Sequence, residues 1–180
     1  MGILNSFIQS LKSNAIKGHK VSLRYCFISG GGLITLFLLT TFFSKNPINN
    51  FWKNFFEIVW IAFIYTHALK NFKEESEVVT YKQGCAIGLI LVVYSVLILF
   101  IFAFVYIKFV DTTLLNTVWE KFISIKEARG KSKEEIALSL NFAKKIFWPF
   151  YFFKESLFLI PLAFIVPYFV YRKKEEGSSV

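Results

Sequence analysis

Residues 84–107 read GCAIGLILVVYSVLILFIFAFVYI and hold no charged side chain; Lys82 and Lys108 lie on either side of this run. A helix needs about 20 apolar residues to cross the hydrocarbon core of a bilayer, which is about 30 Å thick. Large apolar side chains occupy every face of the run, which is typical of a helix surrounded by lipid. The run therefore predicts a transmembrane helix over residues 84–110.

Three further stretches predict spans. Residues 25–43 are charge-free and long enough to cross a bilayer on their own. The charge-free parts of the other two are shorter, and they reach spanning length only with aromatic flanks that suit the membrane interface. We expect spans over residues 51–69 and 147–171. The alternative for these two segments is a re-entrant or interfacial helix.

The composition excludes several classes of protein. Of the 180 residues, 55% are hydrophobic and 19% are aromatic, including 23 Phe. Disordered chains need low hydrophobicity, and collagen-like or disulfide-scaffold chains need far more Gly or Cys. We expect an all-α fold: a polytopic membrane helix bundle with four transmembrane helices and a helical excursion between spans three and four. The expected organisation is an N-terminal segment (1–24), a membrane domain (25–171) and a C-terminal tail (172–180).

The chain carries a formal charge of +9, from 21 Lys and Arg against 12 Asp and Glu. Basic residues border the apolar runs. Attraction to anionic lipid headgroups and the positive-inside rule both produce this pattern. Arg24 and three lysines precede the first span, whereas Lys45 alone follows it, so we expect both termini in the cytoplasm. No nucleic-acid motif accompanies the charge, so membrane lipids rather than nucleic acid are the expected partners.

A helix is expected before the first span, and loops are expected between the spans. Apolar residues recur at helical spacing from Ile3 to Leu11, and basic residues follow them. They predict an amphipathic, basic helix within residues 1–24 that lies on the cytoplasmic leaflet; a frayed terminus is the alternative. Polar loops are expected over residues 44–50 and 70–83.

The connection over residues 111–146 is too long for a turn and too polar to span. Apolar residues at three-to-four spacing predict a helix over residues 114–128, and Gly130 ends it. Ser132, with Glu135 three residues later, is a capping-box pattern that starts a second helix. The apolar stripes of these helices need cover from the outer leaflet, from each other or from another protein.

Small residues and prolines mark unusual places in the spans. Gly84 and Gly88 form a Gly-x-x-x-Gly step, which lets two helices approach closely and favours packing against another span or another copy. Three consecutive glycines, Gly30, Gly31 and Gly32, indicate a closely packed or bent site in span one, or a place where a ligand approaches the backbone. Pro161 and Pro167 predict kinks in span four.

Five charged residues lie within or beside the spans, all on the predicted outer side: Lys53, Glu57, Lys108, Lys154 and Glu155. A charge at mid-bilayer costs at least about 2.5–3.5 kcal/mol on insertion scales, so these side chains need partners. They form either an interhelical polar staple, an outward-facing pocket for an anionic headgroup or a proton, or an exposed interfacial set. His67 is expected at the interface rather than in a proton relay.

Nothing in the sequence has the pattern of a reactive site. Cys26 and Cys85 both lie in apolar runs and are expected to be small packing residues. A Lys–Glu mixture without His, Ser or metal ligands nearby is a poor catalytic constellation. We therefore expect no enzymatic activity, no metal site and no cofactor.

Several short segments share the layout of a known family. They are 24–30 (RYCFISG), 70–73 (KNFK), 80–84 (TYKQG) with Gly88, Gly130 with 132–136 (SKEEI), and Glu155 and Pro161 with 172–174 (RKK). Together they resemble a bacterial family of small inner-membrane proteins with four predicted spans, domain of unknown function 4199. The resemblance implies a bacterial cytoplasmic membrane protein and implies no particular activity.

Two functions are compatible with this pattern. The first is a non-catalytic accessory or structural subunit of a membrane complex, with a protein partner or self-association in the membrane. The alternative is a small carrier or handler of an anionic or lipid-linked substrate, acting as a homodimer because four spans are few for a transporter.

Overall fold

The structure, a computed structural model, describes residues 2–43, 51–76 and 80–176. This part of the chain forms six α-helices and no strand. They are α1 (Gly2–Phe43), α2 (Phe51–Glu75), α3 (Tyr81–Phe109), α4 (Thr113–Ala128), α5 (Lys133–Leu159) and α6 (Leu162–Glu176). The expected all-α fold is therefore confirmed, whereas the loop expected over residues 44–50 lies outside the described residues.

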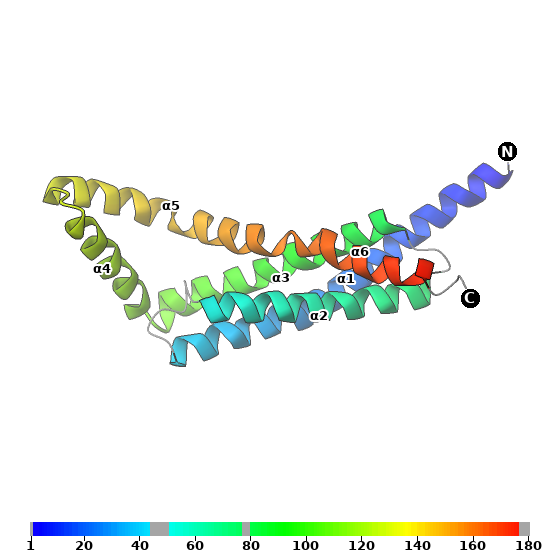
Figure 1. The fold of residues 1–180 in the computed structure, drawn as a ribbon, viewed down its shortest axis with the longest axis horizontal. Coiled ribbons are helices and arrows are strands. Elements are labelled where there is room, and N and C mark those ends of the chain that lie inside the picture. The colour runs from blue at the N-terminus through cyan, green and yellow to red at the C-terminus, as the bar shows by residue number, and fades with distance from the viewer. Residues whose placement is uncertain (1, 44–50, 77–79, 177–180) are drawn as a thin grey trace.

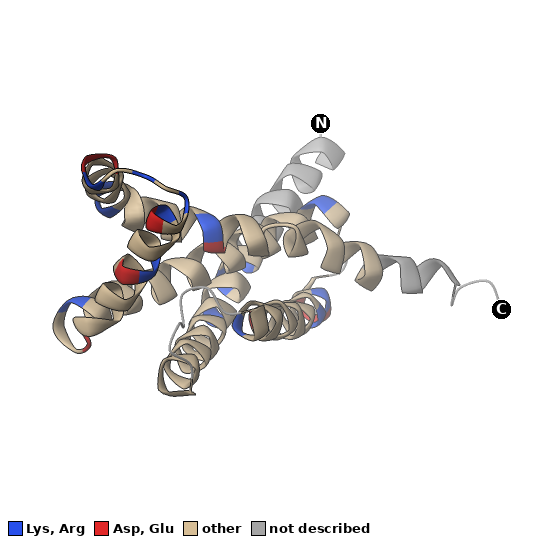
Figure 2. Ribbon diagram, turned by 60° about the vertical axis from the view of Figure 1, so that its left-hand side comes forward, with Lys and Arg blue, Asp and Glu red and all other residues tan. Residues whose placement is uncertain are grey.

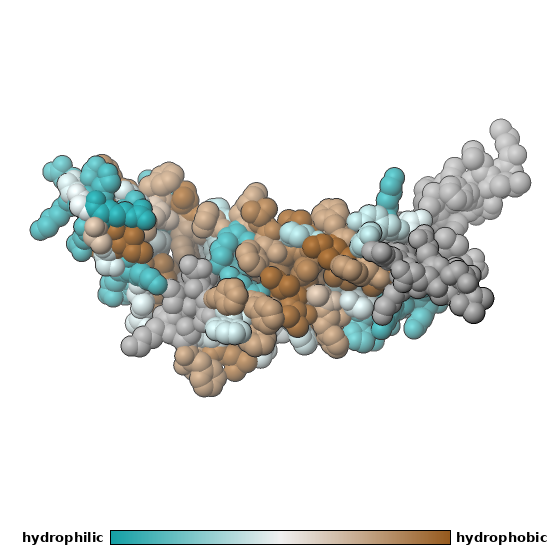
Figure 3. Space-filling model, in the orientation of Figure 1, coloured by the Kyte–Doolittle hydropathy of each residue, from teal (hydrophilic) through white to brown (hydrophobic). Residues whose placement is uncertain are grey.

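The helices form an elongated bundle with an arm at one end. In Figure 1, α1, α2, α3 and the line of α5 and α6 run along the long axis, and α4 with the first half of α5 projects from one end. We call residues 113–146 the arm. Charged residues of both signs gather along it (Figure 2), while apolar residues dominate the middle of the molecule (Figure 3). The start of α1 and the end of α6 lie at the end opposite the arm (Figure 1).

Three segments are long and apolar enough to cross a membrane. They are Lys17–Phe43 in α1, Tyr81–Phe109 in α3, and Lys133–Val170, which covers most of α5 and α6. The chain is therefore a multi-pass membrane protein. The segment expected to be span two, now within α2, is not among these three segments.

The loop expected over residues 70–83 is wrong in its extent. Helix α2 continues through Lys73 to Glu75, because Lys and Glu are good helix formers that can extend a helix into solvent. Helix α3 starts at Tyr81, where Thr80 and Gln83 make a capping box: the Gln83 N–H donates to Thr80 Oγ1 at 3.3 Å, and the Thr80 N–H donates to Gln83 Oε1 at 2.9 Å.

The arm follows the sequence prediction closely. The helix expected over residues 114–128 is present as α4, and Gly130 follows it with φ of +70°, a conformation that favours glycine. The predicted capping box is confirmed, since the Glu135 N–H donates to Ser132 Oγ at 3.2 Å and the Ser132 N–H to Glu135 Oε2 at 3.1 Å. Helix α5 then continues without interruption past Pro149 into the apolar part of the molecule.

Tyr65 of α2 joins three helices at the centre of the core. Its hydroxyl donates to the Gly84 carbonyl of α3 at 2.6 Å, and the Ala163 carbonyl oxygen of α6 lies 3.2 Å from the same hydroxyl, as a second acceptor for its one proton. A Cβ at Gly88 would collide with the Tyr65 ring, so the Gly-x-x-x-Gly step serves contact within one chain. The surrounding buried side chains include Leu33, Phe37, Ile61, Leu91 and Leu99.

The other special residues take different positions. A Cβ at Gly32 would collide with the Trp60 indole and one at Gly30 would lie 2.9 Å from Ile98, whereas one at Gly31 would meet nothing within 4 Å. Pro161 lies between α5 and α6, at the break in the helix, and Pro167 lies inside α6. Cys26 and Cys85 are both buried and free.

Candidate functional site

Lys53 and Glu57 of α2 meet Glu155 of α5 inside the bundle. Lys53 is followed by Glu57 four residues later, so both lie on one face of α2. The Lys53 ammonium is 2.8 Å from Glu57 Oε1 and 3.2 Å from Glu155 Oε1. Lys154 adds a second ammonium, 3.5 Å from Glu155 Oε1. We call these four residues the charge cluster.

Three of the four members are shielded from the surroundings. The exposed fraction is 0% for Lys53 and 2% for each glutamate, whereas the side chain of Lys154 is 26% exposed. Two cations and two anions leave the cluster formally neutral. Removal of one member of such a group leaves an uncompensated buried charge, which is strongly unfavourable. The cluster therefore fixes α2 against α5 through its own pairing.

The opposite face of α2 carries large apolar side chains. Phe55, Phe56, Val59 and Phe63 are all exposed at the surface of the bundle. His67 lies on this face too, with its ring centroid 4.6 Å from that of Phe63, and it is outside the cluster. In the part of α2 before His67, the two charged residues, Lys53 and Glu57, are therefore the ones that the bundle buries.

Lys108 does not join the cluster, although its position in the sequence suggested that it would. Its side chain is exposed near the end of α3, and its ammonium lies 5.5 Å from the ring centroids of Phe104 and of Phe109. Lys108 belongs to the last turn of α3, where a cation interacts favourably with the helix C-terminus.

Three residues that lie next to the charge cluster, or one turn from it, along α2 and α5 have buried polar atoms without a hydrogen-bond partner. Among the described residues, these buried atoms without a partner are Asn54 Oδ1, the Tyr151 hydroxyl and Ser156 Oγ. Tyr151 was not among the predicted site residues because it lies in an aromatic run that resembles an interfacial belt. Its spacing to Glu155, one helical turn, is the signal that could have identified it.

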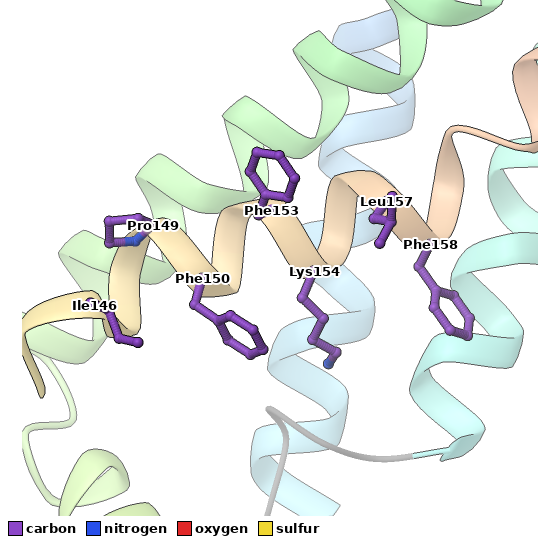
Figure 4. Close-up of a pocket in the computed structure, with 7 residues that line it drawn as sticks. All are labelled: Ile146, Pro149, Phe150, Phe153, Lys154, Leu157 and Phe158. Atoms are coloured by element: carbon purple, nitrogen blue, oxygen red, sulfur yellow. The ribbon is translucent and has the colours of Figure 1, made fainter. Parts of the chain in front are cut away.

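Two apolar hollows meet at Lys154. The arm hollow, of about 470 Å³, lies between α4 and α5 and is lined by Val118, Trp119, Phe122, Ala143, Ile146, Phe147, Phe150, Tyr151 and Lys154. The α5 hollow, of about 640 Å³, is lined by Ile146, Pro149, Phe150, Phe153, Lys154, Leu157 and Phe158 (Figure 4). Lys154 is the one charged residue that lines either of them.

The described residues contain no group of three or more His, Cys, Asp and Glu side chains that could hold a metal ion. A family model described as a protein of unknown function (DUF4199) matches residues 24–170. The chain belongs to the DUF4199 family. The match to DUF4199 starts at Arg24 within α1 and ends at Val170 within α6, so it includes the whole charge cluster and confirms the resemblance noted in the sequence. No curated protein and no solved structure matches the chain.

Proposed function

We propose that the protein crosses the bacterial cytoplasmic membrane four times, with α2 as the additional span and both termini in the cytoplasm. Three observations support this. Lys53 and Glu57 of α2 face the bundle, the outward face of α2 is aromatic, and Lys53 and Lys73 lie about 30 Å apart along the helix at 1.5 Å per residue. The start of α1 and the end of α6 also lie at one end of the molecule (Figure 1), as an even number of crossings requires.

Within that topology, we propose that the protein is a non-catalytic subunit that holds a membrane partner through its arm. The observation that carries this proposal is the set of large apolar side chains left exposed on the charged arm, which are Ile125 of α4 and Leu138, Phe142 and Ile146 of α5. Exposed apolar groups rimmed by charged ones are typical of interaction surfaces. The self-paired charge cluster holds the base of α5 in place beneath them.

Site-specific photo-crosslinking in native membranes tests the subunit proposal. A photoreactive residue at Phe142 is expected to give one protein adduct of defined mass, whereas the same probe at Glu134, an exposed polar position on α5, is expected to give none. An adduct of twice the chain mass would identify self-association as the contact. Lipid adducts alone at Phe142, or equal protein adducts from both positions, would contradict the proposal.

A second candidate is a homodimeric carrier or handler of an anionic or lipid-linked substrate. The position of Lys154 between two apolar hollows favours it.

A further inference from the structure

Lys154 is a cation surrounded by apolar side chains, an arrangement that suits the binding of a lipid headgroup. Figure 4 shows the side chains of Phe150, Lys154 and Phe158 extending from the same side of α5, with the lysine between the two rings. The three residues follow one another at intervals of one helical turn. Each of the two hollows therefore presents apolar walls and a single cation.

The depth of Lys154 matches the boundary between headgroups and hydrocarbon. Lys154 shares Glu155 with Lys53, which lies about 30 Å along α2 from Lys73, close to the thickness of a bilayer core. The α5 hollow lies on both sides of this level, from Ile146 and Pro149 to Leu157 and Phe158. The arm hollow lies on the side of the arm, toward Trp119 and Phe122 of α4.

The ring of Tyr151 lines the arm hollow beside Lys154. Tyr151 is 4% exposed, and its hydroxyl has no hydrogen-bond partner among the described residues. The side chain of Lys154 is 26% exposed, so its ammonium can reach an anionic group outside the bundle while it lies 3.5 Å from Glu155 Oε1.

We propose that the protein binds an anionic glycerophospholipid of the surrounding membrane at Lys154. The phosphate lies at the ammonium, and the acyl chains lie against the apolar walls of the α5 hollow and of the arm hollow. The cation selects a lipid with net negative charge, because the headgroup of a zwitterionic lipid brings its own cation to the same place. This inference goes beyond the subunit role, since it requires no protein partner.

Native mass spectrometry of the full chain tests the proposal, with phosphatidylglycerol and phosphatidylcholine added in equal amounts to the detergent-purified protein. We expect preferential retention of one phosphatidylglycerol per chain. Lys154→Gln is expected to weaken that retention about fivefold, whereas Lys154→Arg retains it because the positive charge remains. Lys145→Gln is the matched control, since Lys145 is an exposed lysine of α5 that lines neither hollow.

A second variant tests the arm hollow independently of the charge. Ala143→Phe places a ring in the arm hollow and is expected to reduce phosphatidylglycerol retention, while size-exclusion chromatography shows an unchanged elution volume. Equal retention of the two lipids, or unchanged phosphatidylglycerol retention in either Lys154→Gln or Ala143→Phe, would overturn the proposal. Retention of free fatty acid in place of phospholipid would overturn it as well.

Discussion

Residues of the same type differ in their surroundings in this protein, and the lysines Lys53 and Lys108 show this most clearly. Lys53 compensates two buried carboxylates at once, whereas Lys108, also a lysine near a span end, is exposed beside two phenylalanine rings. The same residue type is therefore indispensable in one place and replaceable in the other. The glycines of α1 and α3 show a similar contrast between packed and open positions.

Lys53→Met is expected to lower the free energy of unfolding by about 3–5 kcal/mol, because Glu57 is then buried without its cation and Glu155 keeps only the partly exposed Lys154. Unfolding in mixed detergent micelles, followed by circular dichroism, measures the change. Lys108→Met serves as the control and is expected to leave stability nearly unchanged. Equal losses in the two variants would show that the burial of Lys53 contributes nothing specific.

Gly88→Ala and Gly31→Ala are expected to act in opposite directions. A Cβ at Gly88 collides with the Tyr65 ring and is expected to lower the midpoint of thermal unfolding. A Cβ at Gly31 meets nothing and gains up to about 1 kcal/mol of helix propensity, so the midpoint is expected to stay or rise. A fall at position 31 as large as at position 88 would count against this arrangement of α1 and α3.

At the scale of elements, local signals in the sequence were reliable and long-range partners were not. Gly130 and the pair Ser132 and Glu135 marked the turn of the arm because caps and turns depend on neighbours along the chain. Lys53 and Glu155 are 102 positions apart, and their pairing depends on how α2 packs against α5, which periodicity does not determine. The prediction that Lys108 belongs to the charge cluster was wrong for the same reason, because membership depends on how the helices pack.

Ser132→Ala is expected to destabilise the start of α5 by about 1 kcal/mol, because it removes the cap of the Glu135 N–H. Hydrogen exchange of the first turn of α5 should become about fivefold faster, while exchange in α3 is unchanged. Ser124→Ala is the matched control, since Ser124 is an exposed serine within α4 that bonds only to the Lys121 carbonyl. Unchanged exchange in Ser132→Ala would contradict the role of the cap.

At the scale of the whole molecule, the proposed four crossings place the arm and the end of α2 on opposite sides of the membrane. In a Cys26→Ala, Cys85→Ala background, a cysteine at Glu134 is expected to react with a membrane-impermeant maleimide added to intact cells. A cysteine at Glu74, also exposed, should react only after permeabilisation. Labelling of both in intact cells would show that α2 does not cross, and the reverse pattern would invert the orientation.

Helix α5 couples the two halves of the molecule mechanically. It continues without a break from Lys133 in the arm to Leu159, a length of about 40 Å at 1.5 Å per residue, and Pro161 interrupts the helix directly beyond. It therefore acts as a lever whose pivot lies near Pro161, with Glu155 close to the pivot and the tip of the arm far from it on the same side. A force that pulls on the tip of the arm is transmitted, amplified by the leverage, to the contact between Glu155 and Lys53.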